Sequence, residues 1–296
     1  MNTPDHSLNE MEISSTEVTS GPMVAIPTMK SLFIEMYFGE TLLSSGTSFL
    51  AANDQQSHCA LITNRHNVTG RRQDTGACLS KTAAIPDNIV IYFHKNGERT
   101  DEWIPIKLPL YRTDGSPYWI EHPRLGCKAD VVALNLSWGN DVWKMPYYMK
   151  TKHDRSNILV GPAEPISVIG FPFGLSSFGK FPIWATGFLA QEIDLITPDN
   201  PVFLIDCRSR QGQSGSPVIA HRPSGARRKE GNRTIATLSP ENTWEFLGIY
   251  SGRVNQESDL GMVWHVTVVE ELLEGAEAEM LRRKKVHTAS EAPDQE

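Results

Sequence analysis

One short segment of the sequence combines a nucleophilic side chain with unusually small neighbours. Residues 212–218 read Gly-Gln-Ser-Gly-Ser-Pro-Val and contain Ser214 at their centre. Glycines allow a tight turn that points successive N–H groups into one concave spot, which can stabilise the oxyanion formed in acyl transfer. A serine hydroxyl is a weak nucleophile, so this chemistry also needs a base. Taken alone, the segment is equally typical of an ordinary turn before a strand.

A histidine and an aspartate elsewhere in the chain could complete a nucleophilic site. His66 directly follows an apolar segment typical of a buried strand, so its ring can project into a cleft. Asp130 opens another apolar strand, where an unpaired charge would be costly to bury. An aspartate beside such a histidine fixes its tautomer and stabilises the imidazolium. The ordinary alternatives are a surface-loop histidine and a structural aspartate held by backbone N–H groups.

Short strands must position these three side chains. Segments rich in β-branched and aromatic residues, bounded by turn formers, predict two groups of strands and hence two packed β-units. The first group covers residues 31–40, 41–52, 58–64, 88–95 and 130–136. The second group covers residues 165–172, 181–191, 201–207, 216–221, 244–250 and 261–266.

One helix is predicted after the last strand. Residues 267–270 have the form of a capping box that begins at Thr267, and apolar residues then follow on one helical face. Basic residues at 282–285 complement the helix dipole, so we expect a packing helix over residues 268–284. The polar stretches 1–26 and 287–296 are expected to be disordered tails.

Composition narrows the class of protein. The chain has 296 residues and a net charge of −7, which argues against a general nucleic-acid binder. No apolar run approaches the roughly 18 residues that a membrane helix needs, so we expect no membrane span. The basic segment 222–233 is interpreted as a solvated turn. No motif indicates a metal or cofactor site, and the four cysteines form no CxxC pair.

The N-terminal residues contain neither an apolar signal-peptide core nor a basic leader. We therefore expect a cytoplasmic protein whose cysteines remain reduced.

An ordered set of motifs resembles the trypsin-like (chymotrypsin-fold) serine peptidases, most closely the bacterial HtrA-like branch, though without a PDZ domain. The histidine motif at residues 63–68 carries an inserted Asn67, and the aspartate strand lies at residues 129–134. Gln213 departs from the digestive enzymes, which carry an aspartate there, so activation by a new N-terminus is not expected. Further similar segments are residues 46–50, 168–174 and 186–187, Asp206, and residues 248–251.

The resemblance implies an all-β fold of two packed six-stranded antiparallel β-barrels with a C-terminal helix. The peptidase domain would span residues 27–286, with the first barrel at about 31–150 and the second at about 157–266. His66 would be the general base, Asp130 its orienting partner and Ser214 the nucleophile. The backbone N–H groups of Gly212 and Ser214 would form the oxyanion hole.

The resemblance also implies where a substrate would bind. Tyr250, Ser251 and Gly252 would lie beside its backbone, and the Ser251 hydroxyl could reach Asp130. Arg208 falls where the family has the floor of its specificity pocket, so a buried guanidinium there would favour an acidic substrate side chain. Arg208 could equally turn to solvent or pair with Asp206.

Together these features predict a serine endopeptidase that acts on a protein or peptide substrate through an acyl-enzyme intermediate, with no cofactor. The alternative is an inactive protein of the same fold that only binds peptides. An α/β-hydrolase is disfavoured because the second glycine of its elbow is missing, a strand follows the serine, and the best histidine precedes it.

Overall fold

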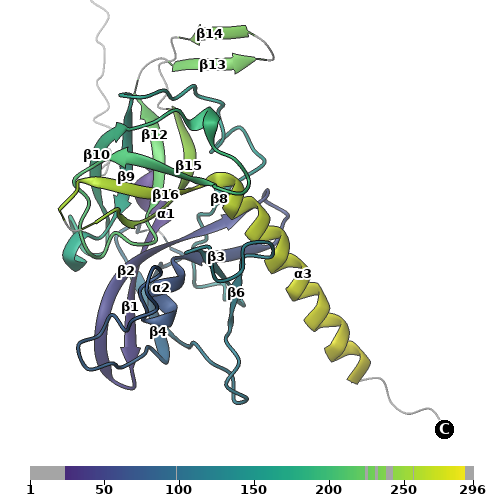
Figure 1. Cartoon of the computed structure of the whole chain (residues 1–296). Coiled ribbons are helices and arrows are strands. Elements are labelled where there is room, and N and C mark those ends of the chain that lie inside the picture. The colour runs from purple at the N-terminus through teal and green to yellow at the C-terminus, as the bar shows by residue number, and fades with distance from the viewer. Residues whose placement is uncertain are drawn as a thin grey trace, which may run out of the picture.

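Two β-sheet units make up most of the structure, one from each half of the chain (Figure 1). The computed structural model describes residues 24–97, 99–223, 226–230, 233–237, 243–255 and 257–290. The fold is all-β with a long C-terminal helix, as the sequence predicts.

The second unit is a closed six-stranded barrel in which every expected strand is present. Its strands join in the order β10-β11-β16-β15-β12-β9, and all neighbours are antiparallel. The strands are β9 (Pro165–Gly170), β10 (Ile183–Leu189), β11 (Val202–Asp206), β12 (Pro217–Arg222), β15 (Thr243–Arg253) and β16 (Leu260–His265).

The first unit is a sheet curled into a half-barrel, so the structure has the expected double-barrel architecture with the first barrel open and the second closed. Its path runs β5-β4-β1-β2-β3-β7-β6, with β8 pairing parallel to β2, and its described ends are not joined to each other. The strands are β1 (Ser31–Phe38), β2 (Thr41–Ala52), β3 (Cys59–Thr63), β4 (Asn88–His94), β5 (Trp103–Pro109), β6 (Trp119–Glu121), β7 (Val132–Asn135) and β8 (Tyr147–Tyr148).

The two ends of this path, β5 and β6, are strands that the sequence pattern does not predict. Strand β5 contains Pro105 and Pro109, which have no N–H group to donate, and proline in a sheet is confined largely to edges. Strand β6 has only three residues. The proline-containing edge strand β5 and the three-residue edge strand β6 have few backbone groups free to hydrogen-bond to each other, so the sheet stays open.

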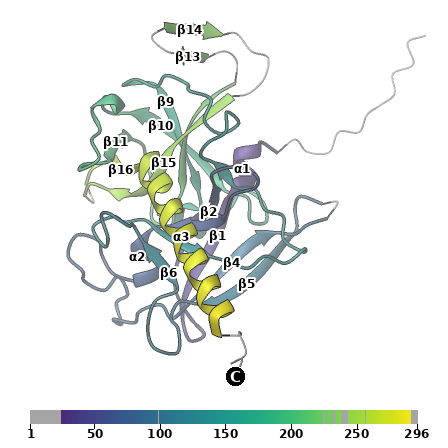
Figure 2. The same ribbon diagram turned by 90° about the vertical axis from the view of Figure 1, so that its right-hand side faces the viewer.

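Helix α3 (Val266–Ser290) covers both units (Figure 2). It begins at Val266, so the predicted capping box at Thr267 is wrong. Instead, Nδ1 of His265 accepts a hydrogen bond from the Thr267 amide at 3.4 Å. The helix also continues beyond the predicted end at residue 284, so residues 287–290 of the expected tail are helical.

The largest core cluster lies between the two units. It includes Phe49 and Ile62 from the first sheet, Ile169 and Phe246 from the barrel, and Leu272 from α3. Burial of this shared apolar surface holds the two units together.

Short helices occur at four further places. They are α1 (Ile26–Lys30), α2 (Arg65–Thr69), η1 (Pro172–Gly174) and η2 (Ile193–Leu195). Helix α1 includes Ile26, the last residue of the expected N-terminal tail. Residues 1–23 and 291–296 of the expected tails lie outside the described residues.

The basic segment 222–233 is not a simple turn. Strands β13 (Ala226–Glu230) and β14 (Arg233–Thr237) form a separate hairpin between β12 and β15, which stands apart from the barrel (Figure 1). Across the described part of the chain, no helix has the length and apolar character needed to cross a membrane.

Candidate active site

The short helix α2 presents His66 to a buried carboxylate. Its Nδ1 atom lies 2.6 Å from Oδ2 of Asp130, and its backbone N–H donates to Oδ1 at 2.9 Å. Asn64, just before the helix, donates its side-chain amide to the Asp130 carbonyl at 2.7 Å. A ring N–H on Nδ1 satisfies this carboxylate and leaves a lone pair on Nε2, which is the form required of a general base.

The carboxylate of Asp130 is fully engaged. The side chain is 1% exposed, and it accepts hydrogen bonds from both groups of His66 and from the Ser251 hydroxyl. The Ser251 contact is the one expected from the sequence. Three hydrogen-bond donors offset the cost of burying this side chain.

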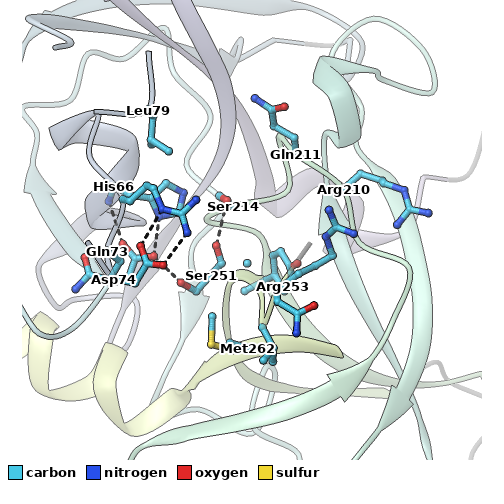
Figure 3. A pocket seen from close by; sticks show the side chains of 16 residues that line it. His66, Gln73, Asp74, Leu79, Arg210, Gln211, Ser214, Ser251, Arg253 and Met262 are labelled. Atoms are coloured by element: carbon cyan, nitrogen blue, oxygen red, sulfur yellow. Dashed lines mark hydrogen bonds and ion pairs between the residues drawn. The ribbon is translucent and has the colours of Figure 1, made fainter. Parts of the chain in front are cut away.

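Ser214 lies at the entrance to β12 and is tied to the first sheet through its carbonyl oxygen. That oxygen accepts from the Thr47 amide at 3.0 Å and from the Asn67 side-chain amide at 3.2 Å. The hydroxyl donates to the Ser251 carbonyl oxygen at 3.1 Å rather than to His66. The nucleophile candidate therefore faces the cleft with its proton directed toward β15 (Figure 3).

The turn before Ser214 has the conformation that only glycine adopts readily. Gly212 has φ of +93°, and its carbonyl accepts from the Thr47 hydroxyl at 3.0 Å. The preceding carbonyl, of Gln211, accepts from the Phe173 amide at 2.6 Å. In a trans peptide the N–H points opposite to the carbonyl, so the Gly212 N–H points away from Phe173.

Two hollows meet at these residues. A cleft of about 760 Å³ and a groove of about 340 Å³ are both lined by His66, Ser214 and Gln211. The groove continues over apolar side chains that include Leu43, Leu79 and Pro86. The cleft is lined in addition by Arg72, Gln73, Asp74, Leu79, Asp130, Arg210, Tyr250, Ser251, Gly252, Arg253, Val254, Asn255 and Met262.

The substrate-binding residues suggested by the sequence separate into two groups. Tyr250, Ser251 and Gly252 line the cleft, whereas Arg208 is exposed to solvent and lies outside the lining. The expectation that Arg208 forms the pocket floor is therefore corrected, because the chain after Cys207 turns its side chain outward while Ser209 turns inward.

The cleft residues that sequence reasoning missed include Arg210 and Arg253. Arg253 had a usable signal, because it lies on the same strand as Ser251 and directly follows Gly252. Arg210 had none, because a turn rather than an extended segment joins it to Ser214.

The described residues contain no group of three or more histidine, cysteine, aspartate or glutamate side chains able to hold a metal ion.

Comparisons with known proteins give similarity to solved structures alone. No protein-family model matches the sequence, and no curated protein matches it. The active form of the M. tuberculosis protease Rv3671c is 16% identical, with a TM-score of 0.45 over 84% of this chain and 81% of that chain. A serine endoprotease from Yersinia pestis is 11% identical, with a TM-score of 0.45 over 87% and 70%.

A third structure, the thermostable serine protease AL20 from an extremophilic microorganism, is 11% identical, with a TM-score of 0.46 over 86% of this chain and 99% of that chain. The first of these structures is described as a protease, and the other two are described as a serine endoprotease and a serine protease. At such low identity and TM-score they assign no residue in this chain, so the site rests on its own geometry.

Proposed function

We propose that this protein is a serine endopeptidase of the trypsin-like kind, nearest in its motifs to the HtrA-like branch. His66 acts as general base, Asp130 orients it, and Ser214 is the nucleophile. One observation carries the proposal: a buried carboxylate binds both the backbone and the ring of His66 in the same cleft that Ser214 lines. A purely structural aspartate would not need a histidine ring that opens into a cleft.

The reaction follows from these positions. The Ser214 hydroxyl turns from the Ser251 carbonyl to Nε2 of His66, gives up its proton there and attacks the substrate carbonyl carbon. The N–H groups of Gly212 and Ser214 stabilise the resulting oxyanion, an effect worth roughly 3–4 kcal/mol per donor. His66 then protonates the leaving amine, and water releases the acyl group by the reverse sequence.

The two hollows suggest how a peptide lies across Ser214. The acyl side of the substrate runs along Ser251 and Gly252 in the cleft, and the leaving side runs over the apolar groove. An extended peptide fits both, because the hollows share the nucleophile and the base.

A second candidate function is peptide binding without hydrolysis. The observation in its favour is the direction of the Ser214 hydroxyl, which donates to the Ser251 carbonyl. Hydrogen bonds between nucleophile and base are commonly long or misaligned without substrate, so this geometry is compatible with either function.

A fluorophosphonate probe tests the proposal, because it reacts only with an activated serine. We expect labelling of the wild-type protein at Ser214, identified by mass spectrometry of the modified peptide, and none of the Ser214→Ala variant. The matched control is Ser216→Ala, which removes a buried hydroxyl from the same loop and should still be labelled. Absence of labelling in the folded wild type would favour the peptide-binding alternative.

A further inference from the structure

The charged groups of the cleft are unevenly distributed around Ser214. On the His66 side, Arg72 and Asp74 form a two-point ion pair, with N–O distances of 3.0 and 2.7 Å. On the opposite side lie Arg210 and Arg253 (Figure 3). The side of the cleft away from His66 is thus lined by two guanidinium groups.

The Tyr250 ring forms the floor of the cleft on the side where Arg210 and Arg253 lie. Tyr250 is 2% exposed, and its hydroxyl is hydrogen-bonded to Ser209. Its ring lies against Gly261, where an added Cβ would approach the ring to 2.7 Å. A substrate side chain entering here meets Tyr250 at the bottom and the two arginines around it. Burial raises the pKa of Tyr250 to about 12, so the floor stays neutral at physiological pH.

Arg210 and Arg253 line the same cleft as Tyr250 and Ser214. Arg210 is held by a hydrogen bond from Nη1 to the Ser209 carbonyl at 2.8 Å. Its carboxylate neighbour, Asp259, lies 3.6 Å away and is half-exposed. An exposed pair at that distance is weak, so Asp259 competes poorly with a bound carboxylate.

We propose that Arg210 and Arg253 together bind the carboxylate of an acidic substrate side chain next to Ser214. This inference deepens the proposed function and rests on it for the reaction, since it makes the protein an endopeptidase that cleaves after acidic residues. Arginine is suited to the role because its planar fork matches a carboxylate with two parallel hydrogen bonds. The recognition lies at the rim of the cleft, above Tyr250, and does not involve Arg208.

Binding is measured first, on the Ser214→Ala variant, so that hydrolysis is not required. The probes are two fluorescent pentapeptides with blocked termini, Ala-Ala-Glu-Leu-Ala and Ala-Ala-Gln-Leu-Ala, which differ in one charge. We expect the Glu peptide to bind about tenfold more tightly at low salt, as a charge-assisted hydrogen bond implies. Adding Arg210→Ala or Arg253→Ala should remove most of this preference, whereas Arg208→Ala, the matched control, should retain it.

Turnover of the same peptides by the protein with Ser214 intact supplies the second readout. Preferred cleavage after Glu that is lost in Arg210→Ala and Arg253→Ala supports the proposal. Equal binding of the two peptides, or a Glu preference that survives both substitutions, overturns it. If the Glu preference in binding is present but neither peptide is cleaved and no fluorophosphonate labels Ser214, the proposed hydrolase function fails while the acidic specificity stands.

Discussion

A buried carboxylate is not by itself the mark of a functional site in this protein. Asp154 is as buried as Asp130 and equally well satisfied, by Lys30 at 2.7 Å and by the Trp244 indole N–H at 2.8 Å. That pair anchors α1 beside β8 and lines neither hollow at Ser214. Asp130 differs because one of its donors is His66, whose side chain keeps 17% exposure toward the cleft. The candidate site is therefore distinguished by the exposure of the His66 ring to the cleft and not by the burial of the Asp130 carboxylate.

A residue-scale prediction concerns His94, which is 1% exposed and lies beside the rings of Trp103 and Phe181. Burial lowers its pKa from 6.5 to about 4. The unfolded chain therefore binds a proton at this histidine below pH 6.5 while the folded protein does not. Stability is full above pH 6.5 and falls as the pH drops toward 4, by roughly 3 kcal/mol for this group.

Denaturant unfolding at several pH values checks this expectation. The free energy of unfolding of the His94→Phe variant should fall less between pH 6.5 and 4 than that of the wild type. Other histidines, such as the partly buried His265 with its pKa also near 4, titrate in both proteins and cancel in the comparison. Parallel pH curves for the two proteins would contradict the assignment.

At the scale of elements, the turn before β12 depends on contacts with the first unit. Thr47 of β2 donates its backbone N–H to the Ser214 carbonyl and its hydroxyl to the Gly212 carbonyl. The Thr63 hydroxyl at the end of β3 in turn donates to the Thr47 carbonyl at 2.8 Å. The turn before Ser214 is therefore positioned by strands of the first sheet as well as by its own barrel.

Gly212→Ala should disable this turn. Its φ of +93° is strained for alanine, and an added Cβ would lie 2.3 Å from the Phe171 carbonyl oxygen. We expect at least a 100-fold loss of kcat in peptide hydrolysis, because one oxyanion donor is displaced. Gly39→Ala is the matched control, with φ of +57° and open space around the new Cβ, and should leave kcat within about twofold. Comparable losses in both variants would show general strain rather than a role for the turn.

At the scale of the whole molecule, the candidate site exists only where the two units meet. His66 and Asp130 belong to the first unit, and Ser214 belongs to the second, just before β12. The shared core and α3 fix their relative position, since Leu272 and Leu273 of the helix pack in the same cluster as β2, β3, β12 and β15 residues. A helix after the last strand thus acts as a brace across both units.

Leu272→Ala should weaken this brace. The side chain is fully buried, and large-to-small changes in a core cost about 2–5 kcal/mol. Tryptophan fluorescence during denaturant unfolding should show a lower midpoint, and peptide hydrolysis should be lost at the same denaturant concentration as the fluorescence signal. Leu281→Ala, on the exposed part of α3, should change the free energy of unfolding by less than about 0.5 kcal/mol. An equal shift in both variants would contradict the bracing role.

Local patterns in the sequence determined the class of fold and the identity of the candidate chemical groups. Side-chain alternation depends on neighbouring residues, so eleven strand segments and the helix were predictable. Strand β5 was not, because Pro105 and Pro109 mask an edge strand that tolerates them. The three-residue β6 and the two-residue β8 are too short to show any period.

Only the tertiary structure decided which side chains share the cleft and how the first sheet ends. Arg208 and Arg210 are two residues apart and of one type, yet Arg210 lines the cleft and Arg208 does not, because a bend after β11 decides which way each points. The direction of the Ser214 hydroxyl likewise depends on Ser251, 37 residues away. Such choices depend on contacts between distant segments, which no pattern of neighbouring residues records.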